Sequence, residues 1–210
     1  MADPSEAARA RSYGQDGGLS IVDRFGIWLS GRAIRRHVKS FAGLRVGDFG
    51  CGYDARFVRT VLGEVREAVL VDVALAPDLV SDPKVWAIEG RLPEALDPLD
   101  DASLDVVLCI SALEHLSEPE RALGTFPRLL RPGGICLINV PSWRGKRFLE
   151  LSAFKLHLSP AAEMDDHKRY YDPRDLWPML VAAGFLPSGI QCSRHKFGLN
   201  TFAACRVPEA

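Results

Sequence analysis

A short apolar segment that ends in an acid and two closely spaced glycines constrains this chain more than any other feature. It covers residues 45–52, with Asp48, Gly50 and Gly52 as its key positions, and a helix is expected from residue 55. Strand, glycine turn and helix in this order form the nucleotide-binding start of many α/β proteins. The glycines allow a sharp turn and a close ligand approach, and the helix then offers free N–H groups.

Two classes of ligand use this geometry, and Asp48 distinguishes them. Gly50, Gly52 and Ala55 fit the dinucleotide fingerprint in its Ala-ended form. A carboxylate two residues before the first glycine, however, would repel a pyrophosphate and attract a cationic amine. S-adenosylmethionine carries an amine and no phosphate, so Asp48 favours this cofactor. A nicotinamide-dependent oxidoreductase is the alternative that the glycine spacing supports.

A second apolar strand, at residues 67–73, also contains an acid near its end. Asp72 lies 20 residues after Gly52. At this position of an α/β fold, a carboxylate accepts hydrogen bonds from ribose hydroxyls. We therefore predict that Asp72 binds the ribose of the cofactor, with an ordinary strand-end acid as the alternative.

Strands and helices alternate through the chain, which is typical of a parallel α/β sheet. The predicted strands cover residues 44–49, 67–73, 85–88, 104–110, 135–140, 186–193 and 199–207. The predicted helices after the first strand cover residues 55–62, 119–130 and 173–183, with Gly63 and Gly184 ending the first and the last. Residues 131–134 are expected to form a tight turn. The last two strands are expected to form a hairpin.

The first 43 residues differ from the rest. Residues 1–18 are polar, and we expect a frayed or ligand-ordered arm. Residues 20–41 have an amphipathic helical pattern rich in arginine, and the sequence allows a break near Ser30 that divides it into two helices. We predict an arm and lid helices over residues 1–43 and one domain over residues 44–210. Contact with a membrane surface is the weaker alternative for the helices.

The composition suits one globular domain. The chain has 210 residues, 47% of them hydrophobic, and a formal net charge of −1. This balance gives no reason to expect nucleic-acid binding. Five scattered cysteines without a Cys-x-x-Cys pair favour reduced thiols in a cytoplasmic protein. No apolar run approaches the ~18 residues of a membrane span, and we recognise no signal-peptide core.

Five segments in this order resemble the class I S-adenosylmethionine-dependent methyltransferases, especially the small single-domain type. They are Asp48-Phe49-Gly50-Cys51-Gly52, Asp72, residues 103–116 with Leu113-Glu114-His115-Leu116, residues 129–134, and residues 167–185 with His167-Lys168-Arg169-Tyr170-Tyr171. The resemblance covers about residues 40–207. It implies a Rossmann-like three-layer α/β/α sandwich around a seven-stranded, mostly parallel sheet. The implied strand order is 3-2-1-4-5-7-6, with strand 7 antiparallel.

The resemblance also implies a cofactor site. Its predicted members are Asp48, Gly50, Cys51, Gly52, Asp72, Val73, Glu89, Gly90 and Ile110. The glycines would approach the methionine part, Asp48 its amine, and the backbone of Ile110 its amino-acid end. This chain departs from the family at Asp54, often a third glycine, which we expect to cap the next helix. It also has Arg91 where the family often has an Asp near adenine, so Glu89 or backbone atoms must make that contact.

His115 and His167 are the predicted general bases, each with a structural histidine as the alternative. His115 follows the fourth strand, close to the expected methyl group, and His167 lies in the segment expected on the substrate side. We expect no metal. Relatives that methylate catechols with a divalent ion resemble this chain at Glu114, but they carry another acid where Ser111 stands here.

The predicted activity is methyl transfer, expected at an oxygen of a small-molecule or sugar-like acceptor, by a monomer or homodimer. The pocket is expected among basic and aromatic residues, namely the Arg-rich helix with Trp143, Arg144, Lys146, Arg147, His167 and Arg169. Transfer to nitrogen or carbon, an RNA or protein acceptor, and a non-catalytic relative that keeps the cofactor pocket are the open alternatives.

Overall fold

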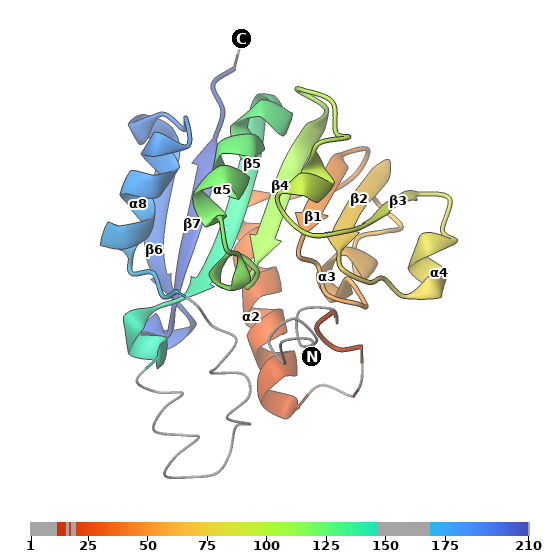
Figure 1. Cartoon of the computed structure of the whole chain (residues 1–210), viewed down its shortest axis with the longest axis horizontal. Coiled ribbons are helices and arrows are strands. Elements are labelled where there is room, and N and C mark those ends of the chain that lie inside the picture. The colour runs from red at the N-terminus through yellow and green to blue at the C-terminus, as the bar shows by residue number, and fades with distance from the viewer. Residues whose placement is uncertain (1–11, 16, 18–19, 147–168, 210) are drawn as a thin grey trace, which may run out of the picture.

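The computed structural model describes residues 12–15, 17, 20–146 and 169–209 (Figure 1). Its sheet has seven strands in the order β3-β2-β1-β4-β5-β7-β6. The strands are β1 (Arg45–Phe49), β2 (Glu67–Asp72), β3 (Val85–Glu89), β4 (Leu104–Ile110), β5 (Leu130–Pro141), β6 (Ile190–His195) and β7 (Asn200–Arg206). Strands β1 to β5 pair in parallel, and β7 is antiparallel to both β5 and β6. The predicted order and the antiparallel strand 7 are confirmed.

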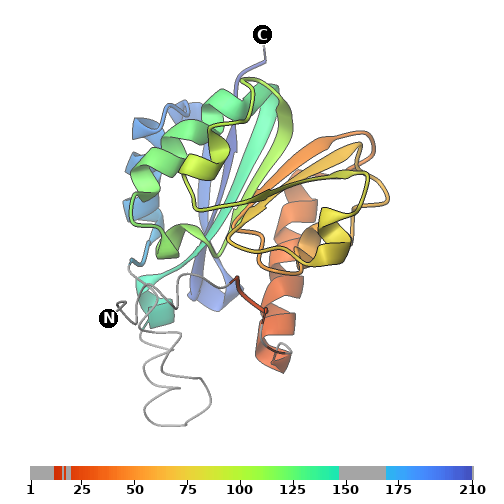
Figure 2. The ribbon, with the colours of Figure 1, turned by 45° about the vertical axis from the view of Figure 1, so that its right-hand side comes forward.

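Helices cover both faces of the sheet (Figures 1 and 2). The α-helices include α2 (Ile21–His37), α3 (Arg56–Arg59), α4 (Pro77–Val80), α5 (Pro119–Leu129) and α8 (Pro173–Ala182). Short 3₁₀ helices are η1 (Glu94–Leu96), η2 (Leu113–His115), η3 (Pro187–Gly189) and η4 (Lys196–Gly198). One core cluster includes Ile34 of α2 and Leu79 of α4, and the other includes Phe126 of α5 and Leu180 of α8. The sheet separates these clusters, so the predicted three-layer sandwich is confirmed.

Several element boundaries follow directly from local chemistry. Strand β4 has the predicted bounds. Its side chains are buried on both faces of the sheet, which explains the continuous apolar run in its sequence. Pro119 occupies the first turn of α5, where the missing N–H costs nothing. Gly184 follows the end of α8 with φ 106°, the left-handed conformation expected just after a helix.

Other local predictions are wrong. Helix α2 is continuous, because Ser30 is buried and Gly31 packs closely on Phe57, where a Cβ would lie 3.3 Å from the ring. Helix α3 ends at Arg59. The next backbone hydrogen bond runs from the Thr60 N–H to the Phe57 carbonyl and spans three residues, as in a 3₁₀ turn. The chain after it therefore forms turns, and Gly63 does not end a helix.

Two further corrections concern turns. Asp54 does not cap α3; its carboxylate pairs with Arg56 at 2.8 Å, and Ala55 takes the N-cap position with φ 41°. Residues 131–134 do not interrupt the sheet, because β5 runs through them with a register shift against β4. Gly133 absorbs the irregularity with φ 77°.

The reversed direction of β7 determines which loops share the ligand edge of the sheet. Pro141 at the end of β5 pairs with Asn200 at the start of β7. The Ser142 hydroxyl donates to the Gly198 carbonyl at 2.8 Å, and the Ser142 N–H donates to the Leu199 carbonyl at 2.9 Å. The turn between β6 and β7 therefore lies where the parallel strands end. Ligands of open α/β sheets bind at this edge.

In the part of the chain that the structure describes, no helix combines the length and apolarity needed to cross a bilayer.

Candidate functional site

The glycine loop after β1 has the backbone that its sequence predicts. Gly50 and Gly52 have φ of 72° and 73°, which side chains with a Cβ rarely adopt. A Cβ on Gly50 would lie 2.3 Å from the Ala112 Cβ, in the loop after β4. Gly52 faces the N-terminal arm instead, and the neighbouring Tyr53 N–H donates to the Tyr13 carbonyl at 3.0 Å. The loop is thus held between the end of β4 and residues 12–15.

Asp48 gives this loop its charge. The side chain is only 5% exposed, and burial together with the negative charge of Asp72 raises the pKa of Asp48 to about 7. A nearby positive charge would relieve this cost, whereas a pyrophosphate would increase it. The described residues therefore fit the ammonium and sulfonium groups of S-adenosylmethionine better than a dinucleotide.

Asp72 connects the end of β2 to the glycine loop. Its carboxylate accepts hydrogen bonds from the N–H groups of Gly52 and Val73, both at 2.8 Å. These bonds fix the orientation of the carboxylate, and its oxygens retain further lone pairs for hydroxyl groups. Ribose binding by Asp72 stays a prediction that this geometry permits.

The remaining predicted cofactor residues lie around Asp72. Glu89 is paired with Asp72 across β2 and β3, and it accepts a hydrogen bond from the Leu75 N–H at 2.9 Å. The Gly90 N–H donates to the Asp72 carbonyl at 2.9 Å. Ile110 is half-buried at the end of β4, and Cys51 is half-buried in the glycine loop with its thiol pKa raised by burial. The fold brings all these residues to one edge of the sheet.

Glu114 is a candidate functional residue that the sequence prediction missed. It lies in η2, directly after β4, with 1% exposure, and its Oε2 has no hydrogen-bond partner among the described residues. Burial raises the pKa of Glu114 to about 7. The predicted base His115 is half-buried in the same turn. The Leu-Glu-His motif was the available signal, but only the fold shows that the acid is the more buried of the two.

A second buried side chain with one unpaired polar atom lies on β5. Asn139 is fully buried, and its amide donates to the Ser111 hydroxyl at 3.1 Å. Its Oδ1 lacks a partner in the described part of the chain, and Ser111 has the unusual φ of 56°. Buried polar atoms in proteins are normally satisfied, so unpaired ones at a ligand edge mark a place for water or ligand.

The predicted acceptor segment is only partly described. His167 and Arg147 lie outside the described residues. Arg169 forms an ion pair with Glu120 of α5. The Trp143 ring packs against Tyr170 with 5.7 Å between centroids.

Among the described side chains, no group of three His, Cys, Asp or Glu residues is placed to hold a metal ion. The expectation of no metal stays a prediction.

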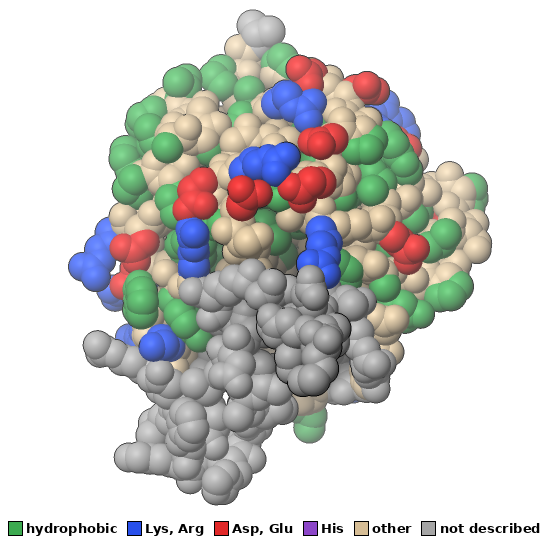
Figure 3. All heavy atoms as spheres, viewed as in Figure 1, with side chains coloured by type: hydrophobic (Ala, Val, Ile, Leu, Met, Phe, Trp, Pro, Cys, Tyr) green, Lys and Arg blue, Asp and Glu red, His purple; other side chains and the backbone are tan. Residues whose placement is uncertain are grey.

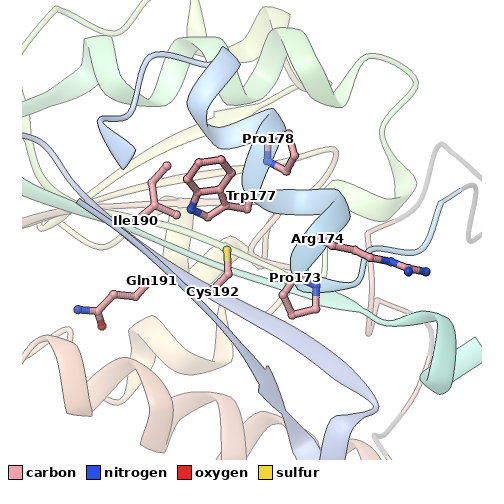
Figure 4. A pocket seen from close by; sticks show the side chains of 7 residues that line it. All are labelled: Pro173, Arg174, Trp177, Pro178, Ile190, Gln191 and Cys192. Carbon is pink, nitrogen blue, oxygen red and sulfur yellow. The ribbon is translucent and has the colours of Figure 1, made fainter. Parts of the chain in front are cut away.

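A large cavity of about 600 Å³ lies between α8 and β6 (Figure 4). It is lined by Pro173, Arg174, Trp177, Pro178, Ile190, Gln191 and Cys192. Burial raises the pKa of the Cys192 thiol to about 11, so this thiol is not activated as a nucleophile. The cavity contains none of the predicted site residues.

Known proteins resemble this chain in sequence and in fold. A family model described as a methyltransferase domain matches residues 24–186. A probable S-adenosylmethionine-dependent methyltransferase of Mycolicibacterium smegmatis is 30% identical over 149 residues, 69% of this chain and 52% of that protein. A ubiquinone biosynthesis O-methyltransferase of Idiomarina loihiensis is 28% identical over 202 residues, 84% of this chain and 80% of that protein. The chain thus spans about half the length of the first relative.

A solved S-adenosylmethionine-dependent methyltransferase from Archaeoglobus fulgidus shares the fold, with a TM-score of 0.63 and 17% identity over 85% of this chain and 93% of that one. The strand order, the acidic glycine loop and the family match over most of the chain agree with one another. We conclude that this chain belongs to the class I S-adenosylmethionine-dependent methyltransferase family.

Proposed function

We propose that this chain transfers the methyl group of S-adenosylmethionine to an oxygen of a small molecule. The observation that carries the proposal is the buried Asp48 carboxyl beside Asp72, because this charge favours a cationic cofactor. When bound, S-adenosylmethionine supplies a methyl group that is already electrophilic on its positively charged sulfur. The residues of the chain then have to bind and orient the cofactor and the acceptor, and to exclude water.

The proposed cofactor contacts follow the sheet edge from β1 to β4. Asp48 attracts the amine, while Gly50 and Gly52 allow the methionine part to approach the backbone. Asp72 accepts from the ribose hydroxyls, and its two bonds to backbone N–H groups hold it in place. Cys51, Val73, Glu89, Gly90 and Ile110 complete the proposed cofactor-binding residues.

An oxygen acceptor also has to lose a proton. We assign this step to the turn after β4, where Glu114 has a buried oxygen without a described partner and a pKa of about 7. A base whose pKa lies near the working pH is the most effective. His115, in the same turn, is the second candidate, and His167 is the third. The name of the O-methyltransferase from Idiomarina loihiensis supports transfer to oxygen.

Two measurements test the proposal. S-adenosylhomocysteine should raise the thermal midpoint of the protein, and NAD and NADP should not, because a ligand that binds the folded state stabilises it. Asp48→Asn should abolish the rise, whereas the matched change Asp54→Asn, at a carboxylate paired with Arg56, should keep it. A rise with a nicotinamide nucleotide alone would overturn the proposal.

Turnover is tested with S-adenosylmethionine that carries an isotopically labelled methyl group and with a panel of hydroxyl-bearing small molecules. Glu114→Gln should lower kcat by roughly 10²–10⁴-fold while the S-adenosylhomocysteine shift remains. His115→Gln serves as the comparison. Cofactor binding without labelled product from any hydroxyl, amine or carbon acceptor would favour the non-catalytic relative.

A further inference from the structure

A second cavity, of about 300 Å³, lies between α2 and the turn that joins β6 to β7. Its basic side chains are Arg32 and Arg36 of α2, His195 at the end of β6 and Lys196 at the start of the turn. Leu29, Ala33 and Phe197 complete the described lining, which contains no carboxylate. The turn belongs to the ligand edge, because Ser142 binds it to the end of β5.

The positive charges in this cavity have no ion-pair partner among the described residues. No described residue forms an ion pair with Arg32, Arg36 or Lys196, although Arg32 does lie over the Trp28 ring at 5.0 Å. The Nε2 atom of His195 is buried and has no hydrogen-bond partner in the described structure. Arg32 and Arg36 are exposed, so the unusual group is this ring nitrogen, because a buried polar atom normally has a ligand, water or protein partner.

The backbone holds the turn in this arrangement. Lys196 and Phe197 have φ of 47° and 59°, a conformation that costs energy for residues other than glycine. A Cβ on Gly26 of α2 would lie 3.5 Å from the Lys196 amino group. The lysine is therefore directed along the side of α2 and not into open solvent.

The electrostatics agree with this geometry. Burial and the charges of Lys196 and Arg36 lower the pKa of His195 to about 4. Burial lowers the pKa of Lys196 to about 8, although Glu114 and Asp23 partly offset that effect. An anion in the cavity would reverse both shifts, since it stabilises the protonated forms.

We propose that this cavity binds the phosphate, or a similar dianionic group, of a small organic molecule or a lipid headgroup. The guanidinium groups of Arg32 and Arg36 suit a planar, bidentate contact with phosphate oxygens, and Lys196 adds a point charge. Leu29 and Phe197 provide apolar contacts for the carbon skeleton next to the anion. The cavity contains none of the predicted cofactor residues, although the charge of Glu114, the proposed base, acts on Lys196. The proposal does not depend on the proposed methyl transfer.

Binding is tested by calorimetry and thermal unfolding of the full chain with inorganic phosphate and with phenyl phosphate. Chloride keeps the ionic strength constant and serves as the control anion. Both ligands should bind saturably to wild-type protein. Arg36→Gln and Lys196→Gln should each weaken binding at least tenfold. Arg24→Gln, an exposed arginine on the same helix outside the cavity, should leave the affinity unchanged.

Vesicle sedimentation separates the two sources of the anion. Binding of phenyl phosphate without retention on phosphatidic acid vesicles identifies a small molecule, and retention on those vesicles but not on phosphatidylcholine identifies a headgroup. In either case, the binding should be lost in the Arg36→Gln variant. No binding of any probe, or binding that survives both substitutions in cooperatively folded protein, overturns the proposal. A separate S-adenosylhomocysteine titration reports on the cofactor site in the same samples.

Discussion

The ligand edge of this sheet has an acidic half and a basic half, and neither resembles the surface over α5. At the ends of β1 and β2, Asp48 and Asp72 form no ion pair with a described residue. Arg36 and Lys196, beside the β6–β7 turn, form none either. Over α5, positive and negative side chains alternate (Figure 3), and Arg121 contacts two glutamates. The paired charges over α5 form an ordinary solvated surface, whereas the unpaired charges of the edge suit the cationic and anionic ligands that we propose.

The largest effect is expected from Gly50→Val, which tests whether the two halves are independent. The new Cβ would overlap with Ala112, and valine is strained at φ 72°. We expect a loss of about 4 kcal/mol of unfolding free energy and no S-adenosylhomocysteine shift, with phosphate binding retained at temperatures where the variant is folded. Urea titration and calorimetry measure these quantities. Gly63→Ala, with open space around it, is the control, and an equal loss there would contradict the explanation.

Asp48→Asn should change stability in a pH-dependent way. The pKa of Asp48 is raised from 3.8 to about 7 in the folded protein. The contribution of its protonated form to the free energy of unfolding is therefore complete below pH 4 and is lost as the pH rises through 7. At pH 8 the neutral variant should be more stable than wild type by about 3 kcal/mol, and the difference should vanish near pH 4. Urea unfolding from pH 4 to 8 measures it. A less stable variant at pH 8 would show that Asp48 is stabilised by an unseen partner.

Lys196→Met tests the basic half, where the effect on stability should grow as the pH falls. The pKa of Lys196 falls from 10.5 to about 8, so its stabilising contribution is complete above pH 10.5 and is lost as the pH falls through 8. At pH 7 the variant should therefore gain about 2 kcal/mol, after a discount for partial exposure, and lose its affinity for phosphate. The gain should be absent in unfolding experiments at pH 11. A loss of stability at pH 7 would mean that the lysine already has a strong partner.

The smallest effect is expected on the paired surface. Arg128 contacts Asp101, whose side chain is 72% exposed. Arg128→Gln should cost less than about 1 kcal/mol, and high salt should reduce the cost further, because exposed ion pairs are screened. Denaturant unfolding at two salt concentrations gives the answer. A larger cost would place this pair among the structural contacts and weaken the contrast with the ligand edge.

The acidic half was predictable because its residues belong to contiguous motifs. Asp48, Gly50 and Gly52 lie within one strand and turn, and Asp72 ends the next strand. Strand β4 was predictable for a similar reason, since burial on both faces leaves a continuous apolar run. Proline and glycine marked the limits of α5 and α8 through their own backbone preferences.

The basic half depends on contacts that no local pattern contains. Arg36 and Lys196 are 160 residues apart and meet only because α2 packs beside the antiparallel strands. The continuity of α2 has the same origin, since the packing of Gly31 against Phe57 overrides the weak helix propensity of a Ser-Gly pair. Burial of Glu114 likewise depends on how η2 folds back after β4.

The reversed direction of β7 has a consequence for how such proteins diversify. The β6–β7 turn reaches the ligand edge without connecting two parallel strands, so no crossover helix depends on its length or sequence. Residues 195–200 can therefore change without altering how the parallel strands are connected. If the turn helps to bind the proposed anion, replacing it should alter which anions this chain accepts while the glycine loop keeps its cofactor, which makes the hairpin a natural starting point for redesign.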